Sequence, residues 1–376
     1  MKFLVISNFA ASLLGFRHAL ICALQARGLD VHVAAPELMV GNPMRLKLES
    51  QGLTVHTIPM NRTGTNPVHD LRSMWSLWRL MRQIKPHAVL AYTVKPVIYG
   101  LLAARFARVP KRFALITGLG YAFQGDGKRW RMQALVQRLY ALALSKVSVV
   151  FFQNPDDAAL FKQRKIVRED ASISIVNGSG VEVTEFKMAV LPIGAPRFLL
   201  IARLMGDKGV REYAQAAALI RIRHPEVRFD IAGWIDENPN AINQQELNDW
   251  VAAGTLNFLG RLSDVRPAIA ACSVYVLPSY REGTPRTVLE AMSMGRAIIT
   301  TDAPGCRETV AHGENGWLVP VKSVEALQKA VQTFIDDDLL AKKMGIRSRE
   351  IALAKYDVRK VNAQMLNAMQ ISEPLT

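Results

Sequence analysis

An apolar strand-like segment, a turn and a helical pattern follow one another in Val274-Tyr-Val-Leu-Pro-Ser-Tyr-Arg-Glu-Gly-Thr-Pro-Arg-Thr-Val-Leu-Glu290. Proteins with parallel α/β sheets bind ligands at such junctions, outside the carboxyl ends of the strands. Glu282 stands in the Gly/Pro turn and Glu290 in the helical pattern. If every residue between them is helical, the two lie ~12 Å apart along the axis, at ~1.5 Å per residue. An elongated ligand could then contact both carboxylates, although a solvated turn residue and a helix-surface residue would give the same pattern.

Alternating strand-like and helix-like segments extend from this junction towards both ends of the chain. Buried strands are predicted at residues 3–7, 31–35, 55–58, 88–91, 113–116, 147–152, 198–202, 228–232, 255–258, 274–277 and 297–300. Helices are predicted at residues 12–27, 67–84, 97–107, 130–145, 208–223, 264–271, 286–294 and 323–336. This alternation is typical of doubly wound, mostly parallel α/β domains.

The length of 376 residues exceeds that of one ordinary hydrophobic core. A Pro/Gly-containing stretch near residues 186–197 reads as a linker. We therefore predict two Rossmann-like domains, residues 1–186 and 187–356, that face each other across a cleft. A last helix within residues 357–376 is expected to cross back to the first domain.

Composition excludes several classes of protein. No apolar run reaches the ~20 residues that a membrane-spanning helix needs. The N-terminus reads as a strand rather than a signal peptide. Three scattered cysteines imply neither a disulfide framework nor a zinc site, and they fit a reducing cytoplasm. We expect Cys22 and Cys272, which have apolar neighbours, to be buried.

The net charge of +15 is concentrated in one half of the chain: residues 1–185 carry +13 and residues 186–376 carry +2. A basic half predicts an anionic partner, which could be nucleic acid, an anionic membrane or a phosphorylated substrate. Residues 67–85 combine two tryptophans with four basic residues at helical spacing, a pattern that suits either sheet packing or a membrane interface.

Two cations open the second domain. Arg203 ends a predicted strand, and Lys208 precedes a predicted helix. A fixed and a flexible cation beside a helix N-terminus can hold a diphosphate. Glu282 and Glu290 stand in the same domain as this pair of cations. Glu290 can accept hydrogen bonds from the hydroxyls of a ribose, and Glu282 can accept them from the hydroxyls of a sugar. These parts match a nucleoside diphosphate sugar.

Candidate binding loops follow three strands of the first domain, and two of these loops contain glycine. Gly15 lies after the first strand, Lys95 follows a later one, and Gly118 and Gly120 precede Tyr121 after the next. Glycines let the backbone approach a ligand closely, although turn formation alone would also explain them. Several such loops at one sheet edge favour a binding site.

Arg203-x4-Lys208 followed by Glu282-x7-Glu290 resembles the family 4 retaining glycosyltransferases of GT-B fold. The segments Gly233–Pro239, Phe258–Arg261 and Leu277–Gly283 are also similar to the second domain of that family. The first-domain loops resemble a narrower group, the α-1,3-N-acetylgalactosaminyltransferases that extend diphospho-undecaprenol-linked sugars, with related O-antigen, capsule, lipopolysaccharide and exopolysaccharide enzymes.

The resemblance implies retaining transfer without a metal or other cofactor, from a UDP-sugar, expected to be a UDP-N-acetylhexosamine, to a polyprenyl-diphosphate-linked saccharide. It implies a peripheral location on the inner face of a bacterial membrane. Arg203, Lys208 and Glu282 are the implied catalytic residues. Implied donor-binding residues are these three with Gly15, Leu259, Arg261, Gly283, Thr284, Pro285, Arg286 and Glu290. Implied acceptor-binding residues are Arg17, Lys95, Gly118, Gly120 and Tyr121.

One departure concerns a histidine that many members of the family carry in the first domain near the sugar. The loop around Gly118–Tyr121 has none, and His18 is expected to be structural. Two alternatives stay open: a non-hydrolysing UDP-sugar epimerase of the same fold, and a nucleic-acid binder using the basic half. The sequence contains no recognition motif of interleaved aromatic and basic residues, as a nucleic-acid binder would need, so we expect no nucleic-acid partner.

Overall fold

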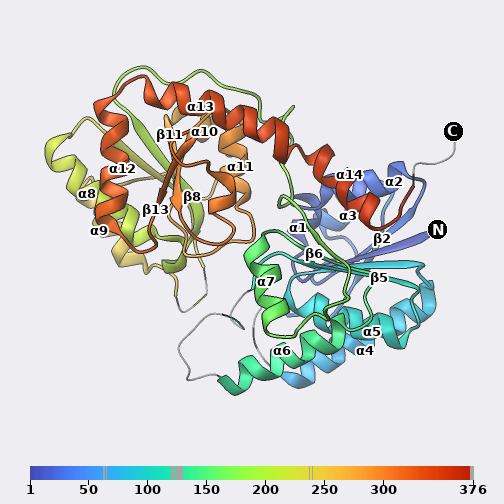
Figure 1. The fold of residues 1–376 in the computed structure, drawn as a ribbon. Coiled ribbons are helices and arrows are strands. Elements are labelled where there is room, and N and C mark those ends of the chain that lie inside the picture. The colour runs from blue at the N-terminus through green and yellow to red at the C-terminus, as the bar shows by residue number, and fades with distance from the viewer. Residues whose placement is uncertain are drawn as a thin grey trace. The chain divides into compact units, whose positions relative to one another are not determined.

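The computed structural model describes residues 1–61, 64, 66–119, 123, 130–236, 238 and 240–372. The chain forms two compact units, Met1–Ser179 with Val361–Thr376, and Gly180–Lys360 (Figure 1). Each unit contains one parallel sheet with helices on both faces, which confirms the predicted fold class. The chain passes between the units after Ser179 and again after Lys360.

The first unit is built on a seven-stranded sheet with the order β3-β2-β1-β4-β5-β6-β7. Its strands are β1 (Lys2–Ile6), β2 (Asp30–Ala35), β3 (Thr54–Thr57), β4 (Ala88–Tyr92), β5 (Lys111–Ile116), β6 (Val149–Phe152) and β7 (Ile173–Ile175). Its helices are α1 (Ala11–Leu14), α2 (His18–Ala26), α3 (Pro43–Glu49), α4 (Pro67–Ile84), the π-helical turn η1 (Pro96–Gly100), α5 (Leu101–Phe106), α6 (Trp130–Leu144) and α7 (Pro155–Gln163).

Two apolar clusters cover the two faces of this sheet. Helices α4, α5, α6 and α7 pack on one face, around Leu77, Leu101 and Tyr140. Helices α1, α2 and α3 pack on the other, together with the C-terminal helix α14 (Val358–Ala368), which contributes Met365. Figure 1 shows α4, α5 and α6 on one side of the strands and α2, α3 and α14 on the opposite side. Because the central strands are covered on both faces, they are apolar except at their first residues, such as Lys2 of β1 and Lys111 and Arg112 of β5.

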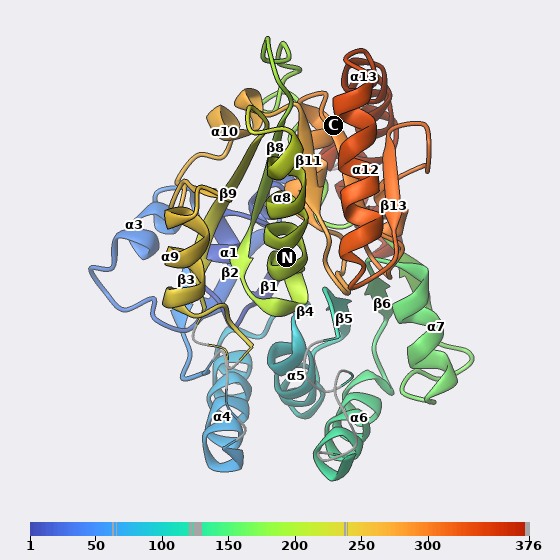
Figure 2. The ribbon, with the colours of Figure 1, turned by 90° about the vertical axis from the view of Figure 1, so that its left-hand side faces the viewer.

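The second unit is built on a six-stranded sheet with the order β10-β9-β8-β11-β12-β13. Its strands are β8 (Arg197–Leu204), β9 (Arg228–Ile235), β10 (Asn257–Phe258), β11 (Val274–Leu277), β12 (Ala297–Thr301) and β13 (Gly316–Val319). Its helices are the 3₁₀ turn η4 (Gly206–Lys208), α8 (Val210–Arg223), α9 (Gln244–Ala252), α10 (Arg266–Ala271), α11 (Arg286–Ser293), the 3₁₀ turn η5 (Arg307–Thr309), α12 (Val324–Asp336), α13 (Leu340–Ile351) and the π-helical turn η6 (Ala352–Tyr356). Figure 2 shows α8 and α12 beside each other on one face of the sheet. Helices α10 and α11 pack on the other face.

Several elements differ from their sequence predictions. The predicted helix 12–27 is two helices, because Gly15–Arg17 interrupt it. The short edge strand β7 was not predicted; its residues are only partly buried, so they lack an apolar signature. Cys272 is buried as expected, but Cys22 is exposed on α2. In the described part of the chain, no helix combines the length and apolar character needed to cross a bilayer.

Candidate functional site

Lys208 and Glu282 are predicted site residues from two separate motifs, and they form an ion pair in the second unit. The Lys208 Nζ lies 2.5 Å from Glu282 Oε1, and the two side chains are only 15% and 16% exposed. Ser279 Oγ donates to the same carboxylate oxygen at 2.8 Å. The backbone N–H of Glu282 donates to the carbonyl of Pro304 at 2.9 Å. Glu282 is therefore held by its backbone and its side chain at the carboxyl end of β11.

Two glycines allow the segments around this ion pair to approach one another. Gly209 has a φ of +69°, and a Cβ there would lie 2.2 Å from the carbonyl oxygen of Pro278. Gly305 has a φ of +81°, and a Cβ there would lie 2.2 Å from the carbonyl oxygen of Glu282. Both positions demand the left-handed backbone and the missing side chain of glycine. The loops after β8, β11 and β12 are thus packed against one another at the carboxyl edge of the sheet.

Arg203, the second predicted cation, lies near the end of β8. Its Nη1 is 2.9 Å from Asp236 Oδ2, in the loop after β9, and the side chains are 33% and 14% exposed. The two cations therefore each contact a different carboxylate of the same unit. A phosphate oxygen could compete for either cation, because it offers the same charge and hydrogen-bond acceptors as a carboxylate. The sequence analysis did not assign Asp236 or Ser279 a role, although both stand within motifs that it quoted.

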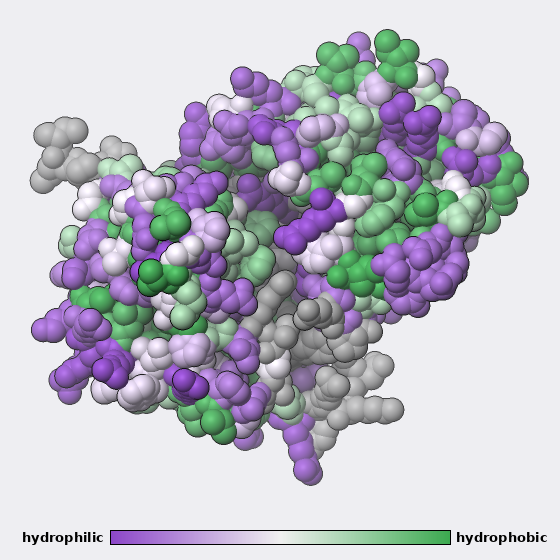
Figure 3. All heavy atoms as spheres, turned by 180° about the vertical axis from the view of Figure 1, so that it is seen from behind, coloured by the Kyte–Doolittle hydropathy of each residue, from purple (hydrophilic) through white to green (hydrophobic). Residues whose placement is uncertain are grey.

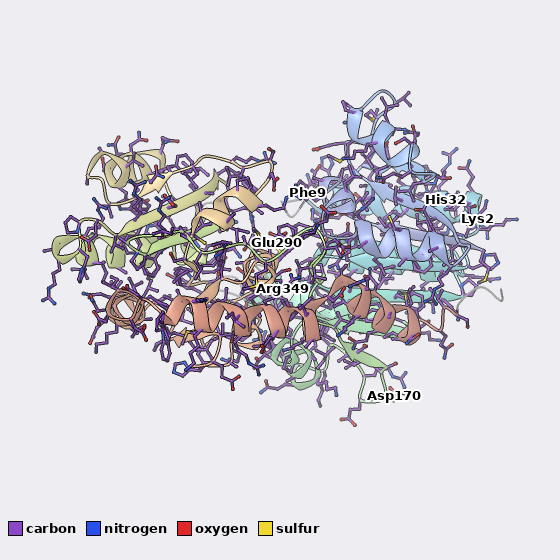
Figure 4. The ribbon with its side chains drawn as sticks, turned by 90° about the horizontal axis from the view of Figure 1, so that it is seen from above. Lys2, Phe9, His32, Asp170, Glu290 and Arg349 are labelled. Atoms are coloured by element: carbon purple, nitrogen blue, oxygen red, sulfur yellow. The ribbon has the colours of Figure 1, made fainter. Side chains whose placement is uncertain are left out.

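Glu290, labelled in Figure 4, is a buried residue of α11, with 7% of its surface exposed. Arg286, one turn earlier, donates Nε to its Oε1 at 2.8 Å. Loss of hydration raises the pKa of Glu290, and the neighbouring Arg286 opposes that rise. Helix α11 begins at Arg286, as predicted, so residues 282–285 lie outside it, and the ~12 Å spacing of an uninterrupted helix from Glu282 to Glu290 does not apply.

The remaining predicted donor-binding residues of this unit lie in loops. The Arg261 guanidinium stacks 4.7 Å from the centre of the Trp234 ring, which is 38% exposed. Leu259 packs against the core, and its N–H donates to the carbonyl of Ile231 at 2.9 Å. Gly283, Thr284 and Pro285 form the turn that leads into α11, where Pro285 is the N-cap.

In the first unit, the loop after β1 contacts the end of β4. The Arg17 guanidinium lies 5.3 Å from the centre of the Tyr92 ring. Ser12 Oγ and the Tyr92 hydroxyl share a hydrogen bond of 2.6 Å, and burial raises the pKa of Tyr92. Gly15, at the C-terminal end of α1, is exposed beside Arg17. The structure therefore joins Arg17 to a buried hydroxyl network that the sequence did not indicate.

Lys95 lies in a second polar cluster of the first unit. Its Nζ is 2.8 Å from Asp70 Oδ1 on α4, and the Tyr99 hydroxyl donates to Asp70 Oδ2 at 3.0 Å. Thr93, at the end of β4, has a φ of +69° and donates its Oγ1 to Asn8 Oδ1 at 2.8 Å. A left-handed β-branched residue is strained, and such residues cluster at functional sites.

The other predicted acceptor-binding residues follow β5. Gly118 has a φ of +144°, which glycine tolerates best. Gly120 and Tyr121 lie outside the described residues. His18 starts α2, with its Nε2 3.6 Å from Cys22 Sγ. In the described ranges, no three His, Cys, Asp or Glu side chains are grouped so that they could hold a metal ion.

Comparison with known families matches both halves of the chain to glycosyltransferase profiles. Residues 6–154 match the profile described as glycosyl transferase 4-like, and residues 195–337 match glycosyl transferases group 1. The N,N'-diacetylbacillosaminyl-diphospho-undecaprenol alpha-1,3-N-acetylgalactosaminyltransferase of Campylobacter jejuni is 28% identical over 375 residues, 95% of each chain. The UDP-Gal:alpha-D-GlcNAc-diphosphoundecaprenol alpha-1,3-galactosyltransferase of Escherichia coli is 27% identical over 287 residues, covering 73% of this chain and 72% of the relative.

Solved structures share the fold at low sequence identity. Sucrose-phosphate synthase from Thermosynechococcus elongatus superimposes with a TM-score of 0.82 at 17% identity, over 98% of each chain. HepE of Anabaena, solved in complex with UDP, has a TM-score of 0.78 at 19% identity, over 98% of this chain and all of the other. These similarities identify the same two-domain fold.

The environment of Glu290 predicts the effect of neutralising it. Because burial raises its pKa in the folded state, the folded protein binds its proton more tightly than the unfolded chain does, so ionisation destabilises the fold as pH rises above 4.5, the ordinary pKa of a glutamate. We expect Glu290→Gln to raise the Tm at pH 7.5, and the gain to disappear as pH falls towards 4.5. Thermal unfolding across this pH range measures the effect.

Glu325→Gln is the matched control, because Glu325 is exposed and Lys329 lowers its pKa. This substitution should lower the Tm slightly or leave it unchanged at pH 7.5. Equal behaviour of the two variants would contradict the assigned environment of Glu290.

Proposed function

The chain belongs to the group 1 glycosyltransferases of GT-B fold, and from this membership we propose that it transfers a sugar from a UDP-sugar to a polyprenyl-diphosphate-linked saccharide. The observation that carries the proposal is the cluster of Arg203, Lys208 and Glu282 at the carboxyl edge of the second sheet. The transfer belongs to the assembly of a bacterial surface polysaccharide or glycan.

The donor's diphosphate is assigned to Arg203 and Lys208. These cations contact Asp236 and Glu282, and a bound donor would exchange carboxylate contacts for phosphate contacts. Such an exchange keeps the cations positioned and partly neutralised before the donor arrives. As the bond to the sugar breaks, negative charge develops on the diphosphate, and fixed cations stabilise that charge in place of bulk water.

Glu282 is assigned to orienting the donor sugar, and Glu290 to binding the ribose. One oxygen of Glu282 already accepts hydrogen bonds from Lys208 and Ser279, which suits a positioning group better than an attacking nucleophile. Transfer with retention then requires the acceptor hydroxyl to approach from the face that the diphosphate leaves. The leaving phosphate takes the proton of that hydroxyl, so no protein nucleophile and no metal ion enter the step.

The acceptor and donor classes are inferred from the relatives. Both transferases quoted above act on sugars linked to diphospho-undecaprenol, and one of them transfers N-acetylgalactosamine. We therefore assign a UDP-N-acetylhexosamine as the donor. Arg17, Gly118 and the Lys95 loop of the first unit are assigned to the acceptor, and the strained Thr93 beside Asn8 supports a binding role for this edge.

Attachment to an anionic membrane is assigned to the helical layer of the first unit. On α4, Trp78 packs against the core, whereas Leu71 and Trp75 are 58% and 56% exposed, with Arg79 5.7 Å from the Trp75 ring. Residues 67–119 contain one acidic residue, Asp70, which is paired with Lys95. On the face visible in Figure 3, exposed apolar residues are interspersed with hydrophilic ones. Charge should therefore contribute alongside apolar contact.

Substitution of the ion pair tests the catalytic assignment. We expect Glu282→Ala and Lys208→Ala each to reduce sugar transfer by at least ~100-fold, because each removes a group that orients the sugar or stabilises the leaving diphosphate. Transfer from radiolabelled UDP-N-acetylhexosamine to a bacterial membrane extract is measured, together with thermal unfolding. Lys329→Ala, at an exposed ion pair of the same unit, is the control and should retain activity. Full activity in both site variants would refute the assignment. If the wild-type protein transfers no label at all, the alternative of a UDP-sugar epimerase is favoured instead.

Vesicle sedimentation tests the membrane assignment. The protein should sediment with vesicles containing anionic lipid at low salt and dissociate at high salt, because screening shortens the range of the attraction. Trp75→Ser should weaken sedimentation, whereas Ile222→Ser, at a 78% exposed residue of the second unit, should not. Equal sedimentation with neutral and anionic vesicles would count against the proposal.

A further inference from the structure

The C-terminal end of α11 is fastened to the segment by which the chain enters the second unit. Ser293, the last residue of α11, is fully buried and donates Oγ to the carbonyl of Phe186 at 2.7 Å. Arg349 on α13 donates Nη1 to the carbonyl of Ser293 at 2.6 Å and to that of Phe186 at 3.0 Å. Figure 4 labels Arg349 and Glu290, which come from α13 and α11. One guanidinium thus joins α13, α11 and the entering segment.

Further contacts hold the same segment along its length. Both terminal nitrogens of Arg349 lie 3.3 Å from the carbonyl oxygen of Val183. Arg296, which is completely buried, donates Nη2 to the carbonyls of Ala189 and Val190 at 3.1 and 3.2 Å. The N–H of Ala189 donates to the carbonyl of Met294, directly after α11, at 3.2 Å. The end of α11 and two cationic side chains therefore provide most of the polar contacts of residues 183–190.

The start of this entering segment is tied to the point where the chain leaves the unit. The N–H of Val181 donates to the carbonyl of Tyr356 at 2.8 Å, and the N–H of Val358 donates to the carbonyl of Val181 at 3.0 Å. Gly180 has a φ of +67°, and a Cβ there would lie 2.6 Å from the Cα of Val358. Both connections between the units are thus joined within the second unit, and residues 181–190 link them to α11.

Burial lowers the pKa of both Arg296 and Arg349, which reflects the cost of removing a guanidinium from water. Apolar side chains would fill the same space without that cost. A guanidinium instead presents five N–H donors in one rigid plane, so it holds carbonyls from separate segments in a single geometry. The arrangement therefore favours precise positioning of residues 181–190 relative to α11 over simple packing.

We propose that α11 couples the donor site to residues 181–190, and that Arg349 is a positioning residue for the transfer reaction. The inference rests on the proposed function, because it takes the donor to bind along α11, beside Arg286 at its start and Glu290 about one turn before Ser293. Helix α11 spans only ~12 Å, at ~1.5 Å per residue, so a shift of its first turn reaches Ser293 with little bending. The bonds of Ser293 and Arg349 transmit that shift to the segment that connects the units.

Hydrogen–deuterium exchange of the full chain, with and without UDP, tests this coupling. In the wild-type protein, UDP should slow exchange at residues 282–293 and also at residues 181–190. In Arg349→Met, the protection of residues 282–290 should remain while that of residues 181–190 is lost. The control is Arg347→Met, on the same helix but exposed and paired with Glu314 and Glu350, which should behave as the wild type.

Steady-state kinetics provide a second test, because a purely structural role of Arg349 would not lower kcat while leaving the KM for the donor nearly unchanged. Arg349→Met should lower kcat about tenfold, a coupling of ordinary size, while the KM for the donor changes less than about twofold. Arg349→Lys, which keeps the charge and one donor group, should recover part of the loss. If Arg349→Met fails to fold, Ser293→Ala removes one bond of the same junction and should reduce the protection of residues 181–190.

The outcomes separate the two proposals. Absence of UDP protection at residues 282–290 in the wild type would overturn the proposed donor site. Protection at residues 282–290 without protection at residues 181–190, or protection of both that survives Arg349→Met and Ser293→Ala, would overturn the coupling alone.

Discussion

The ion pair between Lys208 and Glu282 is the interaction on which the candidate site depends. Its two side chains are about five-sixths buried, so each charge is compensated by its partner where little water can reach it. The pair requires the loops after β8 and β11 to meet, and they can meet only because Gly209 carries no side chain. Gly305 likewise lets the loop after β12 approach Glu282. Ser279 and Pro304 then fix the orientation of Glu282 through its side chain and its backbone. The arrangement presents a cation and a carboxylate at one edge of a parallel sheet, where such folds bind nucleotides.

A site built from paired charges can exchange partners without creating an isolated charge. Arg203 and Asp236 repeat the design of Lys208 and Glu282 one strand away. A diphosphate that approaches this edge meets two cations whose positions are already set, which reduces the reorganisation needed as charge develops on the leaving group. Lys95 and Asp70 form a third such pair in the first unit. The recurrence of carboxylate-held cations suits the proposed function, in which donor and acceptor both carry a diphosphate.

Much of the fold follows from the sequence, because buried parallel strands are apolar throughout and alternate with amphipathic helices. Short or half-exposed elements such as β7 leave no comparable pattern. For the site, the sequence indicated Arg203, Lys208, Glu282 and Glu290 from their positions at strand ends and in one turn. It could not indicate which carboxylate each cation contacts, since Asp236 is 33 residues from Arg203 and Asp70 is 25 from Lys95. Nor could it indicate the left-handed backbone of Thr93, because that conformation arises from tertiary contacts.

The central claim is that the second unit binds a nucleoside diphosphate through its cations, and calorimetric titration with UDP and with uridine tests it most directly. The account predicts that UDP binds at least ~100-fold more tightly than uridine, because charge-assisted contacts to the phosphates supply most of the affinity. It predicts that Lys208→Met weakens UDP binding by at least ~10-fold and leaves uridine binding unchanged. Equal affinity for UDP and uridine, or an equal loss of both in the variant, would contradict it.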